Sequence, residues 1–336
     1  MRRNGTPPDP AQDHAAAAAR FHAVRQREGE RISVPARSRF LTHGARAGLA
    51  VVLLHGFTTS PEQWARFAAE LYERGANVVI PRFPGHGYRD RRTRAIAAVS
   101  ADALIACAAE AVDIARGAGE RVIVAGLSLG ATVAVALALE RDDIARTVGI
   151  VPLFGLRHLG RRANAVLAAL LEALPNAFLP WDPTGGAGQI PAYGYPRFPT
   201  RLLAHCLRLA ETVQRRAAAG DVPSGELPLL LNAHEPACNN MLSTALAMRW
   251  NALRPAASTV TVLNDLPANH DIIDPTNANA RIDLVYPCLR DIIEAPQRAT
   301  GPRRSVSGDF ALRDRVSGDA AQIHHRHLLS LVQPTR

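Results

Sequence analysis

Apolar residues along the chain follow two alternating patterns, and their alternation predicts the fold. Short β-branched or leucine-rich runs predict buried strands, and longer stretches with an apolar stripe predict helices. The predicted strands are residues 49–54, 77–81, 121–125, 147–151, 229–232 and 259–263. The predicted helices are residues 61–74, 101–116, 129–140, 240–251 and 282–293. Strands that alternate with helices are typical of a mostly parallel sheet covered on both faces, so we expect an α/β fold.

The interval from residue 154 to residue 227 interrupts this alternation, because it is much longer than an ordinary connection between a strand and a helix. It contains a helical stripe of leucines between residues 167 and 174, an aromatic and Pro/Gly-rich piece, and a second predicted helix at residues 201–219. Its glycines, in "TGGAG", lack the Lys-Ser/Thr of a phosphate-binding loop and are assigned to turns. We expect the interval to form a cap over one edge of the sheet.

The two ends of the chain differ in composition from its middle. Residues 1–20 are polar and then alanine-rich, and we expect them to be disordered or to form a short leading helix. Residues 296–336 are similar, and we expect a disordered or peripheral tail. The predicted organisation is therefore one α/β domain over residues 21–295, with the cap at 154–227 inside it.

The net charge of +9 comes from the ends. Residues 1–46 hold nine arginines against four acidic residues, and residues 296–336 hold seven against three. Residues 47–295 balance at 23 arginines and 23 acidic residues, and the chain contains no lysine. A basic binding surface normally combines lysine with arginine on the folded body, so the charge does not predict a nucleic-acid partner.

Other compositional features narrow the class of protein. No apolar run reaches the roughly 18 residues that a membrane span needs, and no apolar segment follows the first basic residues as in a secretory signal. The four cysteines, at positions 107, 206, 238 and 288, are widely spaced. We interpret them as reduced thiols rather than as a disulfide framework or a zinc site. These features predict a cytoplasmic protein without stable membrane insertion.

A serine lies where a predicted strand changes into a predicted helix. The sequence there is "GLSLG", with Ser128 flanked by Gly126 and Gly130. A strand, Gly-x-Ser-x-Gly and a helix together form a nucleophile elbow, in which large side chains two residues from the serine would clash. The alternative interpretation is a glycine-rich turn with an incidental serine.

A serine nucleophile needs a histidine base and an acid that orients the histidine, and this kind of fold supplies them in the order Ser, acid, His. Glu235 follows the predicted strand at residues 229–232, and His270 follows the last predicted strand. Both positions meet the expectation for acid and base. Asp265 is the alternative orienting acid, and His234 is expected to be solvated or to support the site indirectly.

The loop after the first buried strand predicts part of an oxyanion hole. Gly56 allows a sharp turn there, and the amide of Phe57 is expected to point at the carbonyl oxygen above Ser128. The amide of Leu129, at the start of a helix, is the second expected donor. His55 is expected to support the loop rather than to transfer protons, and His86 is expected to be structural.

With these pieces in place the chain resembles the α/β-hydrolase superfamily, especially bacterial serine carboxylesterases and monoacylglycerol-lipase-like hydrolases. The resemblance is carried by "VVLLHGFTTSPEQW", "IPRFPGHGYRD", "VIVAGLSLG", "LLLNAHEPACNN" and "ANHDIID", which run in family order over about residues 47–293. It implies an ester-hydrolysing role for Ser128, Glu235 and His270. The departures are Ala131, where many members have a second glycine, and Glu235, where aspartate is usual.

The chemistry predicted from these residues needs neither a metal nor an organic cofactor, and its partner is a small-molecule ester. The same residues could cleave thioesters, lactones, amides or carbon–carbon bonds, which leaves the substrate class open. A binding protein that kept the fold without catalysis is the alternative from another class. Five aromatic residues of the interval 154–227 either line an apolar acyl pocket or pack the cap onto the sheet: Phe178, Trp181, Tyr193, Tyr195 and Phe198.

Overall fold

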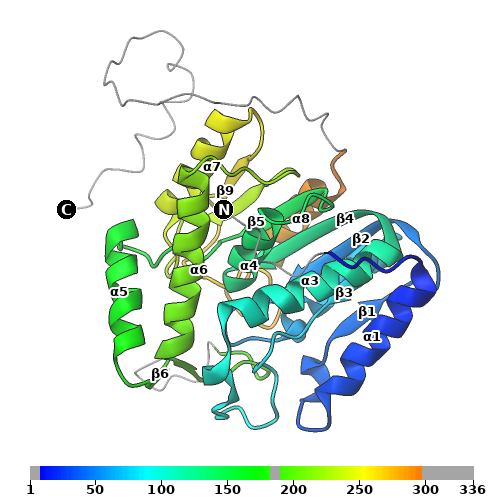
Figure 1. Ribbon diagram of the computed structural model, residues 1–336, viewed down its shortest axis with the longest axis horizontal. Helices are drawn as coiled ribbons and strands as arrows, with labels where there is room; N and C mark the ends of the chain where they lie inside the picture. The colour runs from blue at the N-terminus through cyan, green and yellow to red at the C-terminus, as the bar shows by residue number, and fades with distance from the viewer. Residues whose placement is uncertain (1–7, 182–189, 297–336) are drawn as a thin grey trace. The chain divides into compact units, whose positions relative to one another are not determined.

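A seven-stranded sheet forms the centre of the protein (Figure 1). The computed structural model describes residues 8–181 and 190–296, all within the compact unit formed by residues 1–301. The strands of the sheet are β1 Arg39–Leu41, β2 Ala47–Leu54, β3 Asn77–Ile80, β4 Gly119–Leu127, β5 Arg146–Ile150, β8 Leu229–Asn232 and β9 Val260–Leu263. They lie in the order β1-β3-β2-β4-β5-β8-β9, and every neighbouring pair is parallel except β1 with β3.

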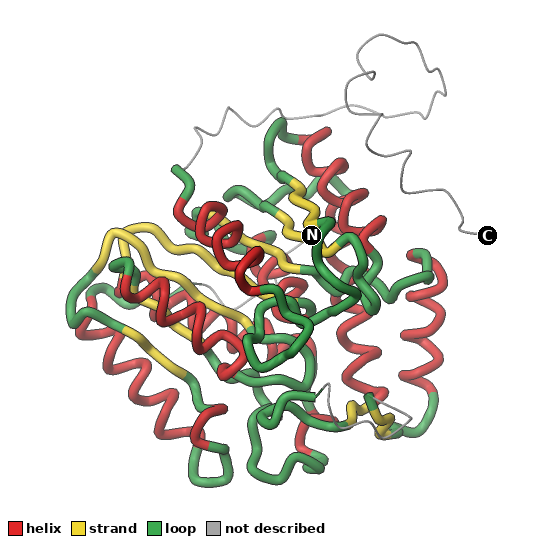
Figure 2. The backbone as a smooth tube through the Cα atoms, turned by 180° about the vertical axis from the view of Figure 1, so that it is seen from behind, coloured by secondary structure: helices red, strands yellow, loops and turns green. Residues whose placement is uncertain are grey.

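Helices cover both faces of this sheet. The α-helices of the described chain are α1 His14–Glu28, α2 Ala65–Glu73, α3 Ala101–Ala118, α4 Leu129–Ala138, α5 Arg161–Ala173, α6 Thr200–Ala218, α7 Asn240–Leu253 and α8 Ile282–Glu294. One face shares a hydrophobic core with α3, α4, α6 and α7, and the opposite face shares a second core with α2 and α8. Figure 2, which shows the molecule from behind, shows helices in front of the sheet on that side as well.

The alternation of side chains along the strands explains the two cores. In β2, Val52 and Leu54 belong to the first core, whereas Val51 and Leu53 belong to the second. Successive side chains of a strand point to opposite faces, so a strand buried on both faces needs an unbroken apolar run. The apolar run that predicted this strand is therefore the direct cause of the layered architecture.

The predicted α/β fold with a mostly parallel sheet is confirmed, and each predicted element corresponds to an observed one. The predicted helix at residues 61–74 is divided into a 3₁₀ turn, Pro61–Trp64, and α2. Among the strands and α-helices outside the interval 154–227, β1 was not predicted, and α1 was predicted only as one of two alternatives. Strand β1 has three residues and pairs antiparallel at the sheet edge, which is too short for a periodic signal. Helix α1 begins inside the N-terminal segment and extends beyond residue 20, with its first turn capped by the Asp13 carboxylate.

The interval between β5 and β8 contains α5, the short strands β6 Phe178–Pro180 and β7 Arg197–Pro199, and α6. Helices α5 and α6 lie side by side (Figure 1). Buried residues of α6, such as Leu202 and Val213, belong to the core beside α4, so this helix is part of the layer that covers the sheet. The "TGGAG" glycines and the predicted C-terminal tail beyond residue 296 lie outside the described residues.

Four loops converge at the carboxyl ends of the parallel strands. They follow β2, β4, β8 and β9, and they carry residues 55–60, Ser128, Glu235 and His270. In open parallel sheets, ligand sites form at this edge. Within the described residues, no helix is both long and apolar enough to cross a membrane.

Candidate active site

Ser128 lies in the sharp turn between β4 and α4. Its backbone angles are φ 55° and ψ −114°, and such a sparsely populated conformation costs about 1–3 kcal/mol. A Cβ atom at Gly126 would lie 2.3 Å from the carbonyl carbon of Gly130, and one at Gly130 would lie 2.2 Å from the carbonyl oxygen of Leu54. Both positions therefore require glycine, for the steric reason that the sequence motif suggested.

Backbone hydrogen bonds hold this strained turn in place. The Ser128 N–H donates to the carbonyl oxygen of Ile150 at 2.9 Å. The Ser128 carbonyl accepts from the amides of Thr132 at 3.1 Å and Leu153 at 3.2 Å, and from the Thr132 hydroxyl at 3.2 Å. None of these bonds uses the Ser128 hydroxyl, so the turn is built independently of the group that would react.

Glu235 and His270 come together although 35 residues separate them. The His270 Nδ1 atom lies 2.8 Å from Glu235 Oε1. The same oxygen accepts the amides of Ala237 at 2.7 Å and Cys238 at 3.0 Å, and the Glu235 side chain is 1% exposed. The backbone thus fixes the carboxylate, and the carboxylate orients the ring.

The two strand ends that carry Glu235 and His270 are also joined directly. The Asn232 side-chain amide, at the end of β8, donates to the carbonyl oxygens of Pro267 at 2.9 Å and Asn269 at 2.8 Å. The alternative acid, Asp265, is exposed. Its charge contributes to the raised pKa of Arg281. His234 contacts the carbonyl oxygen of Leu266 at 2.9 Å. Of the two candidate acids, the structure therefore places Glu235 against the histidine.

The electrostatic surroundings of His270 favour its protonated form. Burial alone would lower the pKa of its imidazole, but the charge and hydrogen bond of Glu235, with a contribution from Asp271, raise the pKa above its ordinary value. The His270 side chain is still 28% exposed. A histidine held in this way can accept a proton from a neighbouring hydroxyl and be stabilised as a cation.

The loop after β2 contains one of the two predicted oxyanion donors. The Gly56 amide donates to Gln63 Oε1 at 2.8 Å, which fixes the turn directly before Phe57. Leu129 is the first residue of α4, and the first amide of a helix has no acceptor within the helix. Phe57 and Leu129 therefore both follow the carboxyl ends of the neighbouring parallel strands β2 and β4.

His55 and His86 are buried supports of this loop. The His55 Nδ1 atom lies 3.0 Å from the carbonyl oxygen of Gly56, and its Nε2 atom accepts the Phe83 amide at 3.1 Å. A carbonyl only accepts and an amide only donates, so His55 is neutral with its proton on Nδ1. Burial, followed by the nearby His86, lowers the pKa of His55 well below its ordinary value, and burial lowers the pKa of His86 to about 4.

Gln63 joins the loop after β2 to the loop that carries His270, although no sequence signal singled it out. Its Oε1 atom accepts from the Gly56 amide and from the Thr59 hydroxyl at 3.0 Å, and its Nε2 donates to Asp271 Oδ2 at 2.7 Å. Gln63 is 1% exposed. Burial and then the charge of Asp274 raise the pKa of Asp271 to about 6, whereas the bond from Gln63 opposes that rise.

Aromatic residues of the capping interval pack against the loop after β2. The Phe57 ring lies 5.6 Å from Trp181 and 5.9 Å from Phe198, measured between centroids. The Trp181 Nε1–H donates to the Thr58 hydroxyl at 2.8 Å, and the Tyr195 amide donates to the Thr58 carbonyl at 2.9 Å. Thr58 has a φ of 60°, so these bonds stabilise an unfavourable backbone conformation beside the predicted oxyanion donor.

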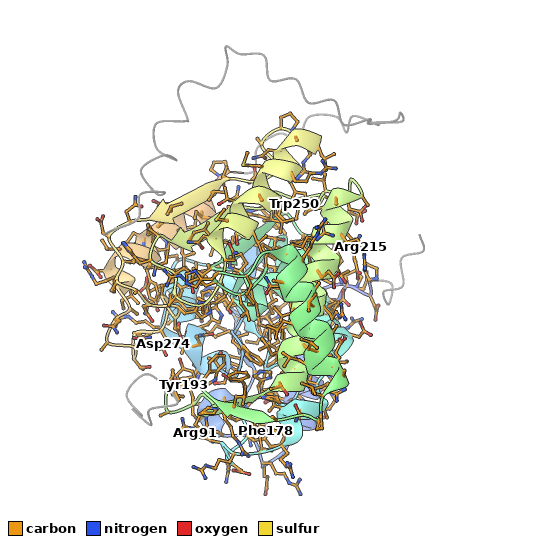
Figure 3. All side chains as sticks on the ribbon, turned by 90° about the vertical axis from the view of Figure 1, so that its left-hand side faces the viewer. Arg91, Phe178, Tyr193, Arg215, Trp250 and Asp274 are labelled. Carbon is orange, nitrogen blue, oxygen red and sulfur yellow. The ribbon has the colours of Figure 1, made fainter. Side chains whose placement is uncertain are left out.

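The other predicted pocket aromatics have structural partners. Tyr195 is 1% exposed, and its hydroxyl accepts the Tyr88 amide at 2.9 Å and donates to the Gly85 carbonyl at 3.0 Å. The Tyr193 hydroxyl donates to Asp274, and the two residues lie next to each other in Figure 3. Phe178 packs under the guanidinium of Arg197. These three aromatics anchor the cap, whereas Trp181 and Phe198 gather around Phe57.

One residue beside the site was not predicted to belong to it. Cys238 is buried three residues after Glu235, and in the described chain one cluster has ligand atoms close enough together to share a metal ion: Glu235, Cys238 and His270. Burial and then the Glu235 charge raise the pKa of the Cys238 thiol well above its ordinary value, and a hydrogen bond with the Ser128 hydroxyl opposes this rise.

Solved structures with the same fold include lipases. A structure from work on two metagenome-derived lipolytic enzymes, LipS and LipT, matches with a TM-score of 0.60 and 17% identity, over 78% of this chain and 99% of that one. The Saccharomyces cerevisiae monoglyceride lipase matches with a TM-score of 0.61 and 13% identity, over 76% and 90%. The Paleococcus ferrophilus monoacylglycerol lipase matches with a TM-score of 0.59 and 16% identity, over 76% and 97%.

At such identities these matches establish the shared fold alone. No curated protein matches the chain. The model of the alpha/beta hydrolase family matches residues 51–288, which include the serine turn, Glu235 and His270. The chain therefore belongs to the alpha/beta hydrolase family.

Proposed function

We propose that the protein is a serine hydrolase that cleaves carboxylic esters. The observation that carries the proposal is the 2.8 Å contact between Glu235 and His270 at the same sheet edge as the strained Ser128. Glu235 follows β8 and His270 follows β9, the positions expected for the acid and the base of such a site. Membership of the hydrolase family and the fold shared with lipolytic enzymes support it.

The reaction would begin with attack of the Ser128 Oγ atom on the ester carbonyl carbon. His270 accepts the hydroxyl proton, and the fixed Glu235 carboxylate stabilises the resulting imidazolium. The carbonyl oxygen becomes an oxyanion, and the donors that we propose to stabilise it are the backbone amides of Leu129 and Phe57.

The tetrahedral intermediate would then collapse to an acyl-enzyme. His270 returns its proton to the leaving alcohol, and the ester carbonyl carbon remains bonded to Ser128 Oγ. Water enters, His270 removes its proton, and the same two amides stabilise the second oxyanion. The carboxylic acid leaves and Ser128 regains its proton, so no external cofactor enters the cycle.

The residues around Phe57 favour an apolar acyl group. The rings of Phe57, Trp181 and Phe198 form one aromatic cluster next to the proposed oxyanion donor. An apolar acyl chain placed against these rings would leave water on binding, which is favourable. Thioesters, lactones and amides present the same carbonyl carbon to Ser128, so the leaving group is the variable that the experiment must test.

A fluorophosphonate probe tests the proposal, because it reacts only with an activated serine. We expect one probe molecule per chain, attached to Ser128 and located by peptide mass spectrometry. We also expect turnover of p-nitrophenyl esters in an acyl series, measured against matched thioester and anilide substrates. A chain that is neither labelled nor active on any of the three would instead be a non-catalytic binding protein.

The bridge made by Gln63 predicts a second effect on activity. Gln63→Leu keeps the volume but removes the bonds to Gly56 and Asp271, so both loops lose a shared anchor. A displacement of about 1 Å at reacting groups costs about 100-fold in rate. We therefore expect kcat on the best ester to fall by roughly 10–100-fold with a much smaller change in KM.

The neighbouring Glu62→Gln variant is the control, since Glu62 pairs with Arg39 and not with either loop. It should keep the wild-type kcat. Equal kcat values for Gln63→Leu and wild type would show that the bridge does not position the site.

A further inference from the structure

Cys238 shares the site with the two residues of the proposed acid–base pair. One ligand atom from each of Glu235, Cys238 and His270 lies within 4.8 Å of the others. Cys238 is 3% exposed, and the Glu235 side chain is 1% exposed. The spacing of the four cysteines argued against a zinc site made of cysteines, but the fold combines a single cysteine with two other kinds of ligand.

Glu235 has an unused binding capacity that points to a ligand. Its Oε1 atom is engaged by His270 and by two backbone amides. Its Oε2 atom is buried, and in the described structure it has no hydrogen-bond partner. A buried carboxylate oxygen without a partner is unfavourable, so a cation at this oxygen would supply a missing interaction.

We propose that Glu235, Cys238 and His270 form a binding site for a zinc ion, and that an ion bound there inhibits the enzyme. A thiolate, an imidazole and a carboxylate are the ligands that zinc takes in proteins. Zinc–ligand distances of about 2.0–2.3 Å place tetrahedral ligand atoms roughly 3.5 Å apart, and the ligand atoms of this cluster lie within 4.8 Å of one another. The fourth position would face Ser128 or water.

Zinc binds cysteine as the thiolate, so the Cys238 thiol proton leaves to solvent as the zinc–sulfur bond forms. The imidazole of His270 binds in its neutral form. The thiolate and the carboxylate together balance the two positive charges of the ion.

The inhibitory consequence rests on the proposed function. With His270 bound to the ion, its ring cannot accept the Ser128 proton, and the carboxylate that orients the ring is shared with the metal. The exposed part of the His270 ring provides a route for the ion from solvent. Zinc would therefore compete with turnover at the reacting groups themselves, without a separate regulatory surface.

The binding arm of the test needs no activity. Zn²⁺ affinity of the full chain is measured by competition with a chromophoric chelator, and Co²⁺ reports thiolate ligation through its near-ultraviolet charge-transfer band. We expect Cys238→Ala to weaken this site by about 100-fold or more, because even changes next to a ligand cost roughly 10–100-fold. The cobalt–thiolate band should disappear in that variant.

Cys206→Ala is the matched control, since Cys206 is also buried but belongs to α6 and not to the cluster. It should keep both the affinity and the cobalt band. Any ion held by other histidines is common to all three proteins, so the difference between them isolates this site. Equal affinity and an equal cobalt band in wild type and Cys238→Ala would overturn the proposal.

The activity arm compares each protein with its own metal-free rate. Micromolar Zn²⁺ should inhibit wild type and Cys206→Ala, with recovery after a chelator is added, whereas Cys238→Ala should need about 100-fold more. Mg²⁺ should not inhibit at the same concentration, because a thiolate is a poor ligand for it. If the protein binds zinc but does not hydrolyse esters, the proposed function is refuted and the metal site stands. If zinc inhibits wild type, Cys206→Ala and Cys238→Ala equally, the metal site is refuted.

Discussion

Ser128→Ala should lower the turnover of p-nitrophenyl esters by roughly 10³-fold or more, the largest effect that we expect from one substitution. The physical reason is that the Ser128 hydroxyl supplies the oxygen atom that would bond to the acyl carbon. The hydrogen bonds that hold the turn involve the Ser128 backbone and not its hydroxyl. The variant should therefore keep the fold while losing both turnover and labelling by the fluorophosphonate probe.

Ser243→Ala is a suitable control, because Ser243 is another buried serine but lies in α7. It should keep turnover and labelling, and circular dichroism should show the same secondary structure for wild type and both variants. Wild-type turnover in Ser128→Ala would remove the basis of the proposed function.

Glu235→Gln should lower kcat by roughly 100-fold or more, because a neutral amide cannot stabilise the imidazolium that forms when His270 accepts the Ser128 proton. One oxygen, Glu235 Oε1, accepts from the Ala237 and Cys238 amides and contacts His270 Nδ1. The amide oxygen of glutamine would take that position, so the ring keeps its orientation but loses the negative charge opposite it. Steady-state kinetics at neutral pH measure the effect.

Asp265→Asn is the control that separates the two candidate acids. Asp265 is exposed, whereas Glu235 contacts the histidine. Asp265→Asn should therefore keep the wild-type kcat. If it lost activity while Glu235→Gln kept it, Asp265 would be the orienting acid after all.

The sequence predicted the sheet well because its central strands are buried on both faces. A run such as residues 49–54 has no polar interruption, and burial on two faces is the physical condition for that pattern. The same reasoning had no information on β1, whose three residues pair only at the sheet edge. It left helix α1 undecided, because an alanine-rich segment has no strong apolar stripe.

The candidate site was predictable only where chain order constrains it. Ser128, Glu235 and His270 could be proposed because each follows a recognisable strand, and the structure brings the last two into contact. Gln63 could not be found in this way, because its partner Asp271 lies 208 residues away. Cys238 was considered only for pairing with other cysteines, so its proximity to a carboxylate and an imidazole came from the fold.

The double attachment of Thr58 has a consequence for how such an enzyme could diversify. One residue receives hydrogen bonds from both Trp181 and Tyr195 and directly follows the proposed oxyanion donor. Under the proposed function, a substitution of Trp181 that changes the preferred acyl group would also remove a hydrogen bond from the residue next to the oxyanion donor. Substrate preference and catalytic rate would then change together, and selection for one would alter the other.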